Sequence, residues 1–114
     1  MAAIKTVVIK DGMPSVEQAR TRLQGELSIA RRDGFRILKL VHGYGSSGVG
    51  GDLRIALQST LRQMSQKQEV QGCIYGENWR TGDERSWELL KRMPELKSDS
   101  DLGRGNRGIT LVVL

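Results

Sequence analysis

The chain has 114 residues, a length that fits one domain with its own hydrophobic core, and we expect a single domain over residues 1–114. Hydrophobic residues make up 38% of the sequence and charged residues 27%, proportions that exclude a globally disordered chain. The net charge of +5 and the pI of about 9.8 favour an anionic partner. Charge alone does not choose between nucleic acid, a phosphate-bearing ligand and an acidic membrane surface.

Cysteine content and hydropathy indicate a cytoplasmic protein without a membrane segment. The single cysteine, Cys73, cannot form a disulfide within the chain, which suits a reducing compartment. No apolar run approaches the roughly 20 residues of a membrane span, and the early charges near the N-terminus are unlike a signal peptide. One histidine and one cysteine far apart in the sequence match no recognised metal-binding spacing, so no metal site is expected.

The first predicted elements are a strand over residues 5–10 and a helix over residues 15–33. β-Branched residues dominate the strand, and an Asp-Gly-Met-Pro turn ends it. Ser15 and Gln18 form a capping-box pattern at the start of the helix, and Gly34 ends it. Apolar residues recur at helical spacing between these ends, with arginines on the opposite face, which predicts an amphipathic helix.

A mostly apolar strand is predicted over residues 35–41, as expected for a central strand of a sheet. It leads into a glycine-rich loop, residues 42–51, and leucines at helical spacing then predict a second helix over residues 52–66. Asp52 stands at the predicted start of this helix, where its carboxylate would cap backbone N–H groups.

The remaining sequence predicts two more strands, separated by an irregular insertion at about 76–104. The strands are expected over residues 70–75 and 109–114, both rich in apolar or β-branched residues. Within the insertion a short helix is predicted over residues 83–92, with Thr81 and Glu84 near its start as capping residues.

This order of elements, β-α-β-α-β-β, predicts an α/β fold. We expect a two-layer sandwich (α+β) in which two main helices cover one face of a four-stranded mixed sheet. Strands that alternate with helices are expected to pair in parallel through right-handed crossovers, and the last strand is expected to add in the antiparallel direction.

The loop between the second strand and the second helix is the best candidate for a binding site. It contains the pattern Gly-x-Gly-x-x-Gly over residues 43–48, directly after a strand and directly before a helix. Glycines let backbone N–H groups approach an anion closely, and the helix N-terminus adds a partial positive charge. The alternative is a connection whose glycines only permit positive φ angles.

Side chains beside this loop suggest proton transfer and base stacking. His42 lies at the carboxyl end of a strand, where α/β sheets place ligands, and a histidine titrates near neutral pH. It is the candidate catalytic acid or base, with Asp11 assisting from the end of the first strand; the alternative is a ring that hydrogen-bonds the loop without chemistry. Tyr44 suits stacking on a base or packing against the second helix.

The residues expected to contact phosphate or base belong to the glycine loop, the following helix and the loop before the last strand. They are Gly43, Tyr44, Gly45, Gly48, Arg54, Arg104 and Arg107. The last two are included because the sheet is expected to bring the loop before the final strand close to His42.

Residues 40–48, Leu-Val-His-Gly-Tyr-Gly-Ser-Ser-Gly, followed by Leu53-Arg54, resemble the small MutS-related (Smr) domain family. That family carries a His-Gly-x-Gly-x-Gly-type loop and a Leu-Arg pair in the next helix. Residues 108–114 resemble the family's final glycine, small residue, threonine and apolar strand. The resemblance implies a fold like the C-terminal domain of bacterial translation initiation factor three. It also implies binding of DNA or RNA, with nicking or endonuclease activity in some members.

The end of the first strand departs from the family pattern. Smr proteins usually carry Leu-Asp-x-His-Gly there, whereas residues 8–12 of this chain are Val-Ile-Lys-Asp-Gly. In some Smr proteins that motif is tied to cleavage, so the resemblance leaves endonuclease activity open. Magnesium is the cofactor expected if the chain is a nuclease, and no cofactor is expected otherwise. The glycine loop and residues 76–104 are both longer than is usual in the family.

Three functions are therefore compatible with the sequence. The first is a nucleic-acid-binding Smr-like domain for DNA or structured RNA, with nicking as an extension. The second is a small-molecule or nucleotide site, because the loop, its helix and the next strand, ending near Glu77, resemble half of a dinucleotide-binding unit. The third is a non-enzymatic protein-interaction module that uses residues 76–104.

Overall fold

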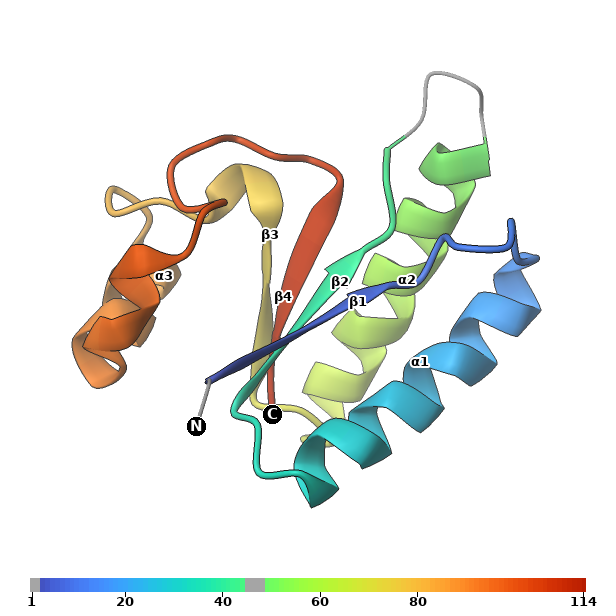
Figure 1. Cartoon of the computed structure of the whole chain (residues 1–114), viewed down its shortest axis with the longest axis horizontal. Helices are drawn as coiled ribbons and strands as arrows, with labels where there is room; N and C mark the ends of the chain where they lie inside the picture. The colour runs from blue at the N-terminus through green and yellow to red at the C-terminus, as the bar shows by residue number, and fades with distance from the viewer. Residues whose placement is uncertain (1–2, 45–48) are drawn as a thin grey trace.

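The computed structural model describes residues 3–44 and 49–114, with the backbone only at residues 49–51. A four-stranded sheet in the order β1-β2-β4-β3 forms its centre (Figure 1). The strands are β1 Ile4–Val8, β2 Ile37–Val41, β3 Gly72–Tyr75 and β4 Ile109–Val113. β1 and β2 are parallel, and β4 runs antiparallel to both of its neighbours, β2 and β3. The predicted mixed sheet and its antiparallel last strand are confirmed.

Two long helices, α1 Val16–Arg32 and α2 Val49–Gln66, cover one face of the sheet (Figure 1). The predicted capping box is present at the start of α1: Ser15 Oγ accepts from the Gln18 N–H at 3.1 Å, and the Ser15 N–H donates to Gln18 Oε1 at 2.9 Å. The apolar face of α1 packs with that of α2 against Leu38, Leu40 and Val112 of the sheet. The helical periodicity of the sequence therefore marks the residues that form this core.

The insertion covers the opposite face of the sheet and adds a third layer to the predicted two (Figure 1). It contains two short 3₁₀ helices, η1 Gly76–Asn78 and η2 Pro94–Ser98, and the helix α3 Glu84–Arg92. Trp79 is fully buried here, and the insertion packs its apolar residues against Ile37, Ile74 and Leu111. Residues that look irregular in sequence thus form a second hydrophobic core.

Two helix starts differ from prediction. α2 begins at Val49, so Asp52 lies within its first turn and not at the capping position; the leucine spacing that defined the prediction begins only at Leu53. α3 is capped by Asp83, whose carboxylate accepts from the Ser86 N–H at 3.0 Å, and not by Thr81. A carboxylate in the first turn still stabilises α2, because the helix N-terminus carries partial positive charge.

Candidate functional site

The carboxyl ends of three strands and the start of the fourth meet at one edge of the sheet. β1 and β2 are parallel, and β3 shares their direction because β2 and β3 both run antiparallel to β4. The segments at this edge are residues 10–11, 42–44, 76–78 and 104–108. The His42 N–H donates to the Gly108 carbonyl at 2.9 Å, which confirms that the loop before β4 lies beside His42.

The His42 side chain is completely buried beneath this edge. Its Nδ1 lies 2.6 Å from the Gly43 carbonyl oxygen, so Nδ1 carries the proton and donates it. Nε2 then accepts from the Thr110 hydroxyl at 2.9 Å, and Thr110 Oγ1 accepts from Gln58 Nε2 at 3.2 Å. Burial, and to a smaller extent the Arg54 charge, lower the pKa of His42 below its ordinary value. The ring is neutral at pH 7 and holds three segments together.

Because the pKa of His42 is lowered on folding, acid is expected to destabilise the protein. The His42 ring binds a proton near pH 6.5 in the unfolded chain and only at lower pH in the folded chain. The contribution of neutral His42 to the free energy of unfolding is therefore fully present above pH 6.5 and is lost as the pH falls through the folded pKa. Urea unfolding at pH 7.5 and pH 5.0 should show a smaller free energy of unfolding at pH 5.0 in the wild type.

The His42→Asn variant provides the control for this pH dependence, because it removes the titrating ring. It should lose less free energy of unfolding between the two pH values than the wild type does. An equal loss in both proteins would show that His42 is not the group responsible.

Gly43 and Gly108 join the β2 loop to the β4 loop. The N–H groups of His42 and Gly43 both donate to the Gly108 carbonyl, at 2.9 and 3.0 Å. The N–H of Gly43 is therefore occupied within the chain, and the expectation that it faces a phosphate is wrong. Gly43 has a φ of +71°, so a glycine is needed for the turn that leads to Tyr44.

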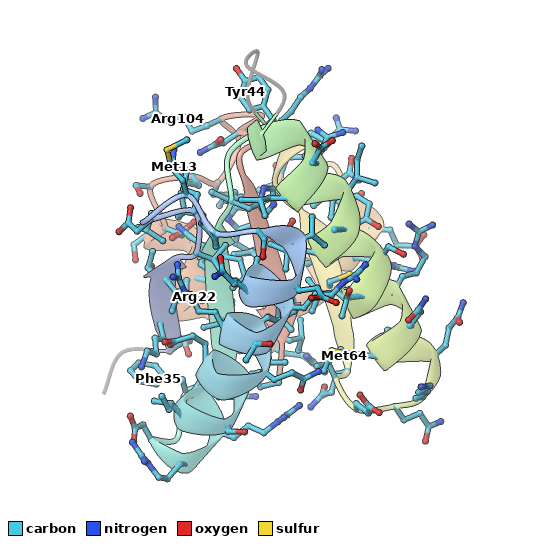
Figure 2. The ribbon with its side chains drawn as sticks, turned by 90° about the vertical axis from the view of Figure 1, so that its right-hand side faces the viewer. Met13, Arg22, Phe35, Tyr44, Met64 and Arg104 are labelled. Carbon is cyan, nitrogen blue, oxygen red and sulfur yellow. The ribbon has the colours of Figure 1, made fainter. Side chains whose placement is uncertain are left out.

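Tyr44 is the large aromatic side chain exposed at this edge, with 58% of its surface accessible. It lines an open pocket of about 500 Å³ together with Arg104, Gly105, Asn106 and Arg107. Figure 2 shows Tyr44 and Arg104 at the same end of the molecule, opposite Phe35 and Met64. The structure thus brings together three of the residues predicted to bind nucleic acid, Tyr44, Arg104 and Arg107, although 60 or more positions separate the tyrosine from the arginines.

Arg54 lies on α2 and faces the segment after β3. Its Nη1 is 3.9 Å from Glu77 Oε2, and both side chains are partly exposed. Within the described residues, Glu77 Oε1 is buried without a hydrogen-bond partner. Part of the Arg54 charge is therefore balanced by Glu77, so Arg54 contributes less positive charge to the edge than its formal charge indicates.

The end of β1 contributes one residue that the sequence analysis missed. A methyl group added to Gly43 would lie 3.5 Å from Cδ and 3.8 Å from Nζ of Lys10, so the Lys10 side chain lies alongside the glycine. The Asp11 side chain is exposed, while Arg22 holds the Asp11 backbone carbonyl at 2.7 Å. Lys10 belongs to residues 8–12, the stretch that departs from the family pattern, and this departure is the sequence feature that could have identified it. Assistance of His42 by Asp11 stays a prediction.

We call four cations at this edge of the sheet the basic edge: Lys10, Arg54, Arg104 and Arg107. Two of the predicted phosphate contacts, Gly45 and Gly48, lie outside the described residues. Among residues 3–44 and 49–114, no group of three or more His, Cys, Asp and Glu side chains is arranged to hold a metal ion. The described part of the site therefore combines positive charge with one exposed aromatic ring.

Comparison with known proteins places this fold and sequence in a family. A family model described as the Smr domain matches residues 11–83. The structure is similar to the Smr domain of Thermus thermophilus MutS2, with a TM-score of 0.56 and 21% identity over 99% of this chain and 98% of that one. A search of curated proteins finds no match. Across the part of the chain that the structure describes, no helix is long and apolar enough to cross a membrane. The chain belongs to the Smr domain family.

Proposed function

We propose that this Smr domain binds nucleic acid, DNA or structured RNA, through the basic edge. The observation that carries the proposal is the pocket that Arg104 and Arg107 line together with the exposed ring of Tyr44. Arginine guanidinium groups bind phosphate oxygens through charge and paired hydrogen bonds, and an exposed aromatic ring offers a face on which a base stacks. Smr domains generally bind nucleic acids, and some are endonucleases.

The described geometry supports binding more strongly than cleavage by His42. Both ring nitrogens of His42 are bonded within the chain, and the ring is buried, so neither nitrogen faces a phosphodiester. We therefore assign His42 the role of holding the loops of the site. Cleavage, with magnesium as its metal, remains a separate hypothesis. A nicking assay with magnesium that compares the wild type with His42→Ala tests it, and an unchanged rate would exclude His42 as the acid or base.

The binding proposal predicts a strong dependence on salt. Each arginine that contacts phosphate releases counterions from the nucleic acid, so the affinity falls linearly in a plot of log K against log salt concentration. Replacing both Arg104 and Arg107 with alanine is expected to weaken binding and to reduce the steepness of this plot by about two. Fluorescence anisotropy with labelled branched DNA, duplex DNA and structured RNA at several salt concentrations measures both quantities.

A charge-matched control uses Arg36 and Lys67, two exposed cations at the opposite end of the sheet, before β2 and after α2. The Arg36→Ala/Lys67→Ala variant loses the same net charge and should retain nearly the wild-type slope of log K against log salt concentration. Equal effects in the two double variants would mean that nonspecific charge, and not the basic edge, drives binding. Absence of binding to every nucleic acid at low salt would refute the proposal. A thermal shift with nucleotides, or a stoichiometric protein partner, would then favour the alternatives.

A further inference from the structure

We propose that a polar network built on the buried Lys39, on the face of the sheet that the insertion covers, positions the arginine loop, residues 104–108, for nucleic-acid binding. The proposal rests on the proposed function. The network consists of Lys39, Asp99, Asp101 and Asn106. It begins on the central strand β2 and ends in the loop that carries Arg104 and Arg107. These are positioning residues, since their contacts are with the chain itself.

The buried end of the network is an ion pair between β2 and the insertion. Lys39 Nζ lies 2.6 Å from Asp99 Oδ1 and 2.7 Å from Asp101 Oδ2, and the Lys39 side chain is only 5% exposed. Trp79 Nε1 donates to the other Asp99 oxygen at 2.9 Å. Burial alone would lower the pKa of Lys39, but the two carboxylates outweigh it and raise that pKa. The hydrogen bond from Lys39 also lowers the pKa of Asp101. Lys39 and Asp101 are therefore both charged at neutral pH.

A chain of hydrogen bonds continues from this pair to the site. Asn106 Nδ2 donates to Asp101 Oδ1 at 3.0 Å, and Asn106 Oδ1 accepts from the Gly108 N–H at 2.9 Å. The Gly108 carbonyl in turn accepts the N–H groups of His42 and Gly43. Asn106 thus uses both ends of its amide to join the ion pair to the turn beside Tyr44.

Besides this link, the start of the loop is held by backbone hydrogen bonds from the Gly103 N–H to the Trp79 carbonyl at 2.8 Å and from the Arg104 N–H to the Asp101 carbonyl at 3.2 Å. Gly103 and Gly105 both have positive φ angles, and beyond their chain neighbours no heavy atom lies within 4 Å of where their Cβ atoms would be. Arg104 and Arg107 are exposed on either side of Asn106. A loop that must be ordered on binding weakens affinity, and a loop that is already ordered avoids this loss. Lys39 also offsets the charges of Asp99 and Asp101, which would otherwise oppose the binding of phosphate.

The test uses Asn106→Ala, which cuts the link and leaves the buried ion pair in place. Thr81→Ala is the control, because Thr81 is an exposed, uncharged polar residue of the same insertion that lies outside the edge segments. Two readouts are taken well below the melting temperature: ¹⁵N heteronuclear NOE values of residues 103–107 in the free protein, and nucleic-acid affinity. We expect Asn106→Ala to lower the NOE values of these residues and to weaken binding by about tenfold, with Thr81→Ala unchanged.

A rescue variant separates positioning from general damage. Asp101→Asn combined with Asn106→Asp exchanges the carboxylate and the amide while keeping the net charge, so the link can re-form in the reverse direction. This double variant should recover part of the affinity and of the NOE values. If the wild type binds but Asn106→Ala keeps its affinity and its NOE values, the inference is overturned and the proposed function stands. If the wild type binds no nucleic acid, the proposed function falls and the inference falls with it.

Discussion

Replacing Lys39 with methionine is expected to lower the free energy of unfolding by about 3–5 kcal/mol. The variant keeps the length of the side chain but leaves Asp99 and Asp101 close together without their cation, in a site where the Lys39 side chain is 5% exposed. A buried charge that has lost its partner destabilises a protein far more than a lost surface pair does. Urea unfolding at pH 7 measures the loss.

Lys5 provides the matched control for this variant. It is also a strand lysine with a carboxylate partner, Glu26 at 3.7 Å, but its side chain is 26% exposed. Lys5→Met should change the free energy of unfolding by less than about 1 kcal/mol, as is usual for surface ion pairs. Adding Asp101→Asn to Lys39→Met should recover part of the loss, because one of the unpaired carboxylates is removed. Similar losses in the two methionine variants would show that the Lys39 pair is not effectively buried.

Gly76→Ala is expected to lower the free energy of unfolding by about 3 kcal/mol. A Cβ atom at this position would lie 1.8 Å from the Asn106 carbonyl oxygen and 2.9 Å from that of Ile109. Both are backbone atoms, one in the loop before β4 and one at the first residue of β4, so they cannot move aside without shifting the loop and the strand. Thermal and urea unfolding measure the effect.

Gly82→Ala is the control for the Gly76 variant. Beyond its chain neighbours, no heavy atom lies within 4 Å of the Cβ position of Gly82, which is exposed in the same insertion. Its substitution should change the free energy of unfolding by less than about 0.5 kcal/mol. Equal free energies of unfolding for Gly76→Ala and Gly82→Ala would contradict the close approach of η1 to the loop before β4.

Local signals in the sequence predict the elements of this fold well. The Ser15–Gln18 capping box, the helical spacing of α1 and α2 and the apolar strands each depend on neighbours within a few residues, and all of them are confirmed. The insertion was harder to predict, because its stability comes from burial of Trp79 and of a few leucines against a distant strand. Such pairing leaves no short-range periodicity.

In the candidate site, too, the features that depend on neighbouring residues or on the order of the strands could be predicted, and those that depend on hydrogen bonds to distant residues could not. The strand-loop-helix pattern locates His42 and Tyr44 correctly at the edge of the sheet, and the position of Arg104 and Arg107 follows from the expected return of the last strand. The internal use of the Gly43 N–H depends on Gly108, which is 65 positions away along the chain. The one visible clue to the Lys39 network is a lysine in the middle of an apolar strand.

The order of strands in the sheet has a consequence for how the chain folds during synthesis. β4 is the last strand along the chain, yet it lies between β2 and β3. In the described sheet β3 pairs with β4 and with no other strand, so it has no hydrogen-bonding neighbour while β4 is still inside the ribosome. The β1-α1-β2 unit can form early, since its contacts are local, whereas the half that contains the arginine loop must wait for the final segment.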